Sequence, residues 1–174
     1  GGLELLFALS GDGQRVVFRA ENVIDGHRLF SAPVDGSSPA IALDGPLTGS
    51  GTTTHFVIAG DRVVYVGRED AEPLRVWSVP LLGPSSENVR LSDEVAQPVS
   101  NQAPRLSPDG TRAAFQVGTV GGRVVRIAPV GGATSSAIRL VAATAEGGVS
   151  SFRFAPDGTR LVFFSDKDVS GMTE

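Results

Sequence analysis

The chain contains no cysteine, which excludes disulfide bonds, thiolate metal ligands and cysteine nucleophiles. Lysine is almost absent too: of the 15 basic residues only Lys167 is a lysine, and the net charge is −4. Without a concentrated basic patch, the sequence does not predict nucleic-acid binding. No apolar run approaches the roughly 18 residues that cross a bilayer. The two histidines, His27 and His55, share no motif, so we expect neither a metal site nor a catalytic triad around them.

Glycine and proline are abundant instead, with 22 and 11 residues among 174. This composition is typical of many turns and therefore of many short strands. No window of 11 or more residues shows helical periodicity with recognisable caps. The sequence therefore predicts an all-β protein.

One hairpin pattern recurs along the chain. The stretch RLSPDGTRAAFQV begins at Arg105, and a near copy, RFAPDGTRLVFFS, begins at Arg153. Pro-Asp-Gly favours a tight turn in which the glycine takes the left-handed conformation. An arginine opens the second strand of each hairpin: Arg15, Arg62, Arg112 and Arg160. An aromatic residue follows each arginine by three positions: Phe18, Tyr65, Phe115 and Phe163.

Each repeat unit contains four predicted strands, and such units in series are typical of propeller blades. We predict one partial β-propeller domain spanning 1–174, built of four-stranded antiparallel blades. Its units cover approximately 3–43, 54–91, 103–140 and 149–174. The propeller is incomplete, with three full blades and half of a fourth, so we expect a fragment of a larger protein or self-association through open blade edges.

The turns SPDGTR and APDGTR, followed by AAF and LVF, and the strands LFSAPVDG and VWSVPLLG resemble TolB-like (WD-repeat-like) β-propeller repeats. The resemblance implies a non-enzymatic scaffold that binds a protein or peptide, and a periplasmic or other extracytoplasmic location. One alternative is the accessory propeller of a larger hydrolase, such as a prolyl-oligopeptidase-like peptidase. Another is a calcium-dependent binding module.

Strand alternation places the turns between first and second strands, and between third and fourth strands, at one end of the blades. The longer connections lie at the opposite end, where function usually resides. These longer connections are acidic, which favours a basic partner, although a merely solvated surface is the alternative. Asp44 is counted among the acidic residues of these longer connections. The candidate partner-binding residues are Glu69, Asp70, Glu72, Asp93 and Glu94.

One loop resembles half of a calcium-binding loop. Asp166, Asp168 and Ser170 alternate as oxygen donors before Gly171, and Glu174 follows. The late acidic ligand would lie beyond the end of this sequence, so an ordinary acidic loop is the alternative.

Two local expectations follow from the repeat register. We expect the recurring arginines to form ion pairs with the aspartates of the adjacent turns. Arg126 occupies the position of Trp77, in a unit whose third strand lies one residue closer to its second. We therefore expect a bulge there, or an arginine at the blade edge.

Overall fold

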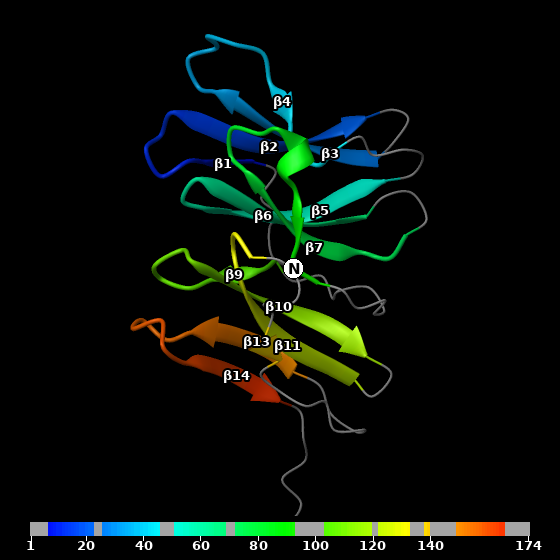
Figure 1. The fold of residues 1–174 in the computed structure, drawn as a ribbon, viewed down its shortest axis with the longest axis vertical. Coiled ribbons are helices and arrows are strands. Elements are labelled where there is room, and N and C mark those ends of the chain that lie inside the picture. The colour runs from blue at the N-terminus through cyan, green and yellow to red at the C-terminus, as the bar shows by residue number, and fades with distance from the viewer. Residues whose placement is uncertain are drawn as a thin grey trace, which may run out of the picture.

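The computed structural model describes residues 7–22, 26–45, 51–68, 72–92, 103–119, 122–132, 138–139 and 149–165. Within these ranges the chain forms four antiparallel β-sheets stacked one above the next (Figure 1). Three sheets have four strands and the last has two, and in each sheet the strands lie side by side in chain order. The predicted all-β class and the incomplete propeller of four-stranded blades are therefore confirmed. We call the sheets blades 1 to 4.

Blade 1 contains β1 (Phe7–Leu9), β2 (Arg15–Asn22), β3 (Gly26–Pro33) and β4 (Ile41–Ala42). Blade 2 contains β5 (Thr52–Ala59), β6 (Arg62–Arg68), β7 (Arg75–Pro80) and β8 (Val89–Arg90), with a short 3-10 turn, η1 (Ser85–Glu87), before β8. Blade 3 contains β9 (Arg105–Leu106), β10 (Arg112–Thr119), β11 (Gly122–Pro129) and β12 (Ile138–Arg139). Blade 4 contains β13 (Val149–Phe154) and β14 (Leu161–Ser165).

The tight turns between first and second strands have the predicted chemistry. In blade 3, the Gly110 amide donates to the Ser107 carbonyl at 2.9 Å, and the Thr111 amide donates to the Asp109 side chain at 3.1 Å. The aspartate side chain thus accepts a hydrogen bond from the Thr111 amide, which has no partner in the strand pairing. The glycine after the aspartate has a positive φ of 67–70° at Gly13, Gly110 and Gly158, and in the shorter turn of blade 2 Gly60, which precedes the aspartate, has a φ of 61°.

All four tight turns lie at the same end of the stack, on the left in Figure 1. We call this the short-turn end. The second strand of each blade ends, and the third strand of blades 1 to 3 begins, at the opposite end, which we call the long-loop end. The directions of the strands therefore agree with the predicted sorting of the loops.

Successive blades pack face to face through alternating apolar residues. Phe56, Tyr65 and Val63 belong to the face of blade 2 that packs against Val17 and Leu29 of blade 1. We call the face that meets the preceding blade the front face, and the opposite one the rear face. Each fully buried Val or Leu contributes about 1.5–3 kcal/mol, so several such side chains hold each pair of blades together.

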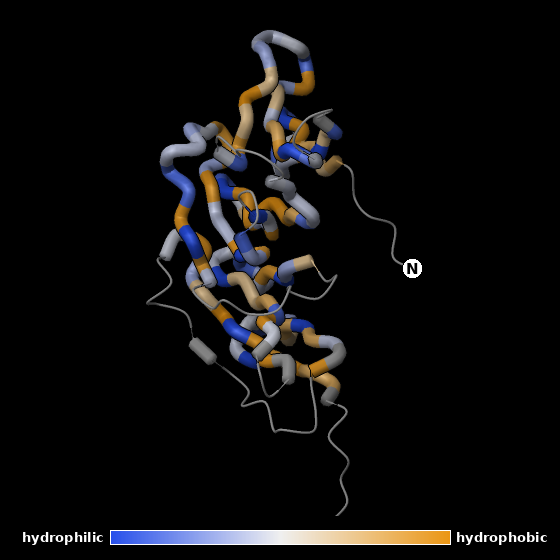
Figure 2. The backbone as a smooth tube through the Cα atoms, turned by 90° about the vertical axis from the view of Figure 1, so that its right-hand side faces the viewer, coloured by the Kyte–Doolittle hydropathy of each residue, from blue (hydrophilic) through white to orange (hydrophobic). Residues whose placement is uncertain are grey.

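The same arrangement recurs between the later blades. The front face of blade 3, with Phe115 and Val117, packs on Val64 and Val76 of blade 2. Phe152 and Phe154 of blade 4 pack on blade 3 through Ala114 and Val125. Hydrophobic residues therefore lie along the whole height of the stack rather than in one central cluster (Figure 2).

Apolar side chains are exposed at both ends of the stack. On the front face of blade 1, Phe7 is 62% exposed and Leu9 is 56% exposed. Phe18 and Phe30 extend the Phe7 row across the sheet, with their rings stacked at 5.6 Å. At the other end, Phe164 on β14 is 69% exposed. These faces are equivalent to those that meet at the interfaces between blades.

Both expectations for Arg126 are wrong: the ladder contains no bulge there, and Arg126 lies on β11, an inner strand that pairs with both β10 and β12. β10 and β11 pair without interruption from Arg112–Pro129 to Thr119–Gly122, and Arg126 lies directly opposite Phe115. Trp77 lies opposite Tyr65 in the same way. This unit has one residue fewer between Arg112 and Pro129 than blades 1 and 2 have between the equivalent residues. Because the ladder is uninterrupted, the difference in length falls on the connection between β10 and β11.

A candidate binding cavity between the first two blades

Most of the predicted site residues lie outside the described residues. This applies to the calcium candidates Asp166, Asp168, Ser170 and Glu174, and to Glu69, Asp70, Asp93 and Glu94 of the partner-binding surface. Both sites stay predictions. In the part of the chain that the structure describes, no group of three or more His, Asp or Glu side chains could hold a metal ion. The same part contains no helix long and apolar enough to span a membrane.

Glu72 is the one partner-surface candidate that the structure describes. Its side chain is exposed and lies 3.8 Å from the Arg75 guanidinium. An exposed pair of this kind contributes little to stability. Glu72 is therefore accessible to solvent, as a residue of a binding surface must be.

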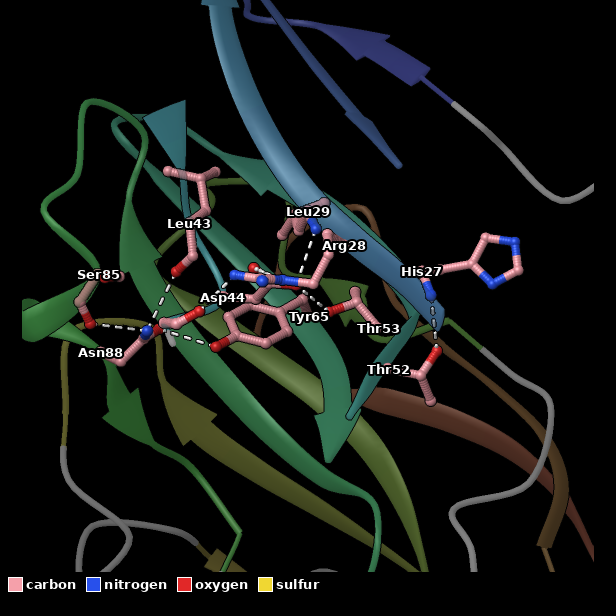
Figure 3. A network of polar contacts seen from close by, with 11 residues as sticks. His27, Arg28, Leu29, Leu43, Asp44, Thr52, Thr53, Tyr65, Ser85 and Asn88 are labelled. Carbon is pink, nitrogen blue, oxygen red and sulfur yellow. Dashed lines mark hydrogen bonds and ion pairs between the residues drawn. The ribbon is translucent and has the colours of Figure 1, made fainter. Parts of the chain in front are cut away.

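Asp44 does not belong to the acidic surface. It is 2% exposed, and its carboxylate accepts hydrogen bonds from Arg28 Nε at 3.0 Å, the Leu29 amide at 2.8 Å and Thr53 Oγ1 at 3.0 Å (Figure 3). Buried charges are tolerated where they are paired and hydrogen-bonded in this way. Because Thr53 lies in blade 2, the Asp44 carboxylate joins the first two blades.

The repeat register explains this position. Asp44 follows the buried Leu43 as Ser92 follows the buried Leu91. Ser92 Oγ accepts a hydrogen bond from the Val76 amide at 2.9 Å, as Asp44 does from Leu29. The residue after the strand-ending leucine is thus an acceptor for the neighbouring strand. The sequence contains this signal, because Leu43 and Leu91 are the last residues of the predicted repeat units 3–43 and 54–91.

A second link between blades 1 and 2 involves Asn88. Its Nδ2 donates to the Leu43 carbonyl at 3.1 Å and to the Ser85 carbonyl at 2.8 Å, while its Oδ1 accepts from the Tyr65 hydroxyl at 3.0 Å (Figure 3). Together with Asp44, this contact fixes the relative position of the two blades. Any site that both blades share is therefore held on a rigid frame.

The two blades border an open cavity of about 610 Å³ at the short-turn end. Blade 1 contributes its tight turn and the start of β2, while blade 2 contributes its tight turn and the segment that follows β7. The lining residues are Ser10, Gly11, Asp12, Arg15, Gly60, Asp61, Pro80, Leu81, Leu82 and Gly83. The cavity lies at the end opposite to the long loops, where the sequence predicted function, and no sequence motif identifies it.

Sequence differences between the turns show how the cavity arises. Blade 3 has Pro108 where blade 1 has Gly11. Pro108 packs towards the tight turn of blade 4: a methyl group added at Gly158 would lie 3.4 Å from Pro108 Cδ. A methyl group added at Gly11 or Gly60 would meet nothing within 4 Å. The missing proline leaves open space between the turns of blades 1 and 2, and the blade 2 turn, Ala59 to Arg62, is also two residues shorter than the blade 4 turn, Ala155 to Arg160.

The recurring arginines also differ between blades. Arg15 Nε donates to Ser31 Oγ at 2.9 Å, and Arg62 Nε donates to Ser78 Oγ at the same distance. In blade 3 the corresponding position is Ile127, which has no hydroxyl, and Arg112 instead donates to the Gly158 carbonyl. Of the expected ion pairs, the described residues contain one, between Arg160 and Asp157 at 3.7 Å; for Arg15 and Arg62 the expectation is wrong.

Two aspartates give the cavity a negative charge. Asp12 Oδ1 accepts hydrogen bonds from Ser10 Oγ at 2.5 Å and from the Gln14 amide at 3.0 Å. These bonds, chiefly that from Ser10, lower the pKa of Asp12 below its ordinary value of 3.8, so its carboxyl is ionised at neutral pH. Asp61 is exposed in the facing turn. Pro80, Leu81 and Leu82 supply the apolar part of the lining.

No protein-family model and no curated protein matches this sequence. Solved structures do match: a protein from Agrobacterium tumefaciens described as TolB superposes with a TM-score of 0.61 at 19% identity, over 93% of this chain and 55% of that one. The chain has a TolB-like β-propeller fold. TolB from Acinetobacter baumannii matches with a TM-score of 0.56 at 15% identity, over 79% of this chain and 32% of that one.

The TolB-like fold is also present in larger enzymes. A puromycin hydrolase matches with a TM-score of 0.63 at 23% identity, over 90% of this chain and 26% of the hydrolase. Identities this low establish the fold alone. This chain spans about half of the length of the Agrobacterium protein and about a quarter of the hydrolase.

Proposed function

We propose that this TolB-like chain is part of a non-enzymatic scaffold that binds a protein or peptide. The observation that carries the proposal is the cavity between blades 1 and 2. It is lined mainly by turn backbone, aspartates and leucines, which are groups that bind and orient rather than react. The fold shared with TolB supports the same function.

A peptide selection tests this proposal. The purified chain is immobilised and panned against a phage-displayed library of random 12-residue peptides, and enriched peptides are synthesised and titrated in solution. We expect a shared sequence motif and saturable binding with a Kd below about 100 μM, which corresponds to roughly 5.5 kcal/mol. Failure to enrich any motif, or enriched peptides that do not bind in solution, would contradict the scaffold function.

We further propose an extracytoplasmic location, which rests on the likeness to TolB. The test is fractionation of the source cells with an antibody to this chain. Recovery with periplasmic markers supports the proposal, and recovery with cytosolic markers contradicts it.

The match to puromycin hydrolase favours a second candidate, the accessory propeller of a larger peptidase. In that case the catalytic groups would belong to another part of the parent protein. The gene that encodes this chain distinguishes the two. A Gly-x-Ser-x-Gly nucleophile elbow in an adjoining α/β segment would support the peptidase, and its absence would favour the scaffold.

A further inference from the structure

We propose that the cavity between blades 1 and 2 binds an arginine side chain of a peptide or protein partner. Arginine combines the cationic group and the long apolar stem that the lining favours. This inference rests on the binding function proposed above and adds the position and chemistry of the site. It places the site at the short-turn end, opposite the acidic loops considered in the sequence analysis.

The apolar part of the lining suits the stem of such a side chain. Pro80, Leu81 and Leu82 follow one another at the end of β7, and Leu82 is 68% exposed. Arginine and lysine bury their methylene groups along apolar surface while keeping the charged group near polar partners. A stem lying on Leu82 would remove apolar surface from water, which contributes about 25 cal/mol per Å².

The charges of the lining favour a cation. Asp12 and Asp61 come from the two facing turns, and Arg15 is the one basic lining residue, so the lining carries a net charge of −1. Asp61 forms no ion pair with any residue that the structure describes. An anionic ligand would approach two carboxylates, whereas a cation would meet two charge-assisted acceptors.

The anchoring of the polar groups favours arginine over lysine. Ser10 and Gln14 hold the Asp12 carboxylate in one orientation, and Ser31 holds Arg15 through Nε. A planar guanidinium can donate to two carboxylates at once in a fixed geometry, while an ammonium group acts as a point charge. The Asp12 carboxylate is therefore oriented before the ligand arrives, and Asp61 in the facing turn supplies a second acceptor for a forked donor.

The corresponding turns of blades 3 and 4 provide an internal comparison. There Pro108 packs against the Gly158 turn and the Arg112 side chain reaches the Gly158 carbonyl, so the space is filled by the protein itself. Blade 1 lacks both contacts because Gly11 replaces the proline and Ser31 holds the arginine. The turns of blades 3 and 4 therefore do not reproduce the open space found between the turns of blades 1 and 2.

The direct test is an NMR titration of the ¹⁵N-labelled chain with N-acetyl-arginine N-methylamide. The matched control probe is the citrulline analogue, which has the same shape and no charge. We expect saturable shifts of the Gly11, Gly60 and Leu82 amides with the arginine probe. Binding of the citrulline probe should be weaker by about tenfold, equivalent to roughly 1.4 kcal/mol. Equal binding of both probes, or no saturable shift, would overturn the inference.

Two variants locate the site. Gly11→Pro gives blade 1 the Ser-Pro-Asp-Gly turn of blade 3 and should place the proline ring in the space between the two turns, so probe binding should fall at least tenfold. Asp61→Asn removes one carboxylate without changing the turn and should weaken binding severalfold. Asp109→Asn is the control, because it also removes a carboxylate from a tight turn, in a turn that does not line the cavity, and binding is compared at a temperature well below its Tm. Unchanged binding in Gly11→Pro and Asp61→Asn would place the site elsewhere.

The two proposals can fail separately. If peptides are enriched and bind, but contain no basic residue and shift other amides, the scaffold function stands and the arginine site is wrong. If no peptide is enriched and the arginine probe does not bind, both fail.

Discussion

Asp44 illustrates how one residue can change its role with burial. In the sequence it is one acidic residue among many next to a loop, but in the structure its carboxylate is inaccessible and hydrogen-bonded by groups from two blades. Arg28 also donates from Nη2 to the Gly45 carbonyl, so both members of the ion pair are held in place. Removal of one member would leave the other buried without its counter-charge.

We therefore expect Asp44→Ala to lower the free energy of unfolding by about 3 kcal/mol or more. Urea denaturation monitored by tryptophan fluorescence measures the change through Trp77. Glu72→Ala is the matched control, because this carboxylate also faces an arginine but is solvent-exposed, and it should cost less than about 0.5 kcal/mol. Equal effects of the two substitutions would show that the Arg28–Asp44 pair contributes no more than a surface pair.

The aspartates of the tight turns make the fold sensitive to acid. The Ser107 hydroxyl and the Thr111 amide lower the pKa of Asp109 from 3.8 to about 2. Since the folded pKa is below the unfolded one, the ionised carboxylate stabilises the fold above pH 3.8, and this contribution is lost as the pH falls towards about 2. Asp12, Asp35 and Asp157 have pKa values lowered in the same direction.

Asp109→Asn tests this dependence, because asparagine keeps an oxygen acceptor but cannot ionise. We expect the variant to have a lower Tm than the wild-type chain at neutral pH, with the difference disappearing as the pH approaches about 2. Thermal unfolding at a series of pH values measures it. A difference in Tm that is independent of pH would contradict the assigned pKa.

Residues whose role is local were predictable from the sequence, and residues whose partners are distant were not. The positive φ of Gly110 and the core position of Phe115 follow from the turn and from strand alternation. The partner of Arg15 depends on Ser31, which lies on another strand and becomes its neighbour only through the pairing of β2 with β3. The cavity is formed by two turns whose following arginines, Arg15 and Arg62, are 47 positions apart in the sequence. No single sequence motif therefore identifies it.

At the scale of the element, the tight turn sets the conformation of each hairpin. Gly158 has a φ of +67° and is buried against Pro108 of the preceding blade. A β-branched residue resists this φ and would also press on the neighbouring turn. The turn therefore links hairpin geometry to the packing between blades 3 and 4.

Gly158→Val should lower the free energy of unfolding by about 1–3 kcal/mol. Gly11→Ala is the control, because Gly11 has no positive φ and an added methyl group meets open space. We expect the control to stay within about 0.5 kcal/mol of the wild-type chain in urea denaturation. An unchanged stability of Gly158→Val would contradict the left-handed turn.

At the scale of the whole molecule, each internal blade uses both of its faces. The front row of blade 2, Phe56–Tyr65–Trp77, lies against blade 1, and the equivalent row of blade 1, Phe7–Phe18–Phe30, is on the outer face of the stack. Exposed apolar sheet faces of this kind promote association. The rear face of β14 adds a second such surface at the opposite end, with Val162 and Phe164 exposed.

The solution mass of the 174-residue chain, measured by light scattering over a concentration series, tests this stacking rule most directly. We expect the average mass to rise above 18.0 kDa as the concentration increases, because the front face of one chain can pack on the rear face of another. The variant Phe7→Glu with Leu9→Glu places charges on the front face and should remain close to 18.0 kDa. A constant mass of 18.0 kDa for the wild-type chain at every concentration would contradict the conclusion that these faces are interfaces between blades.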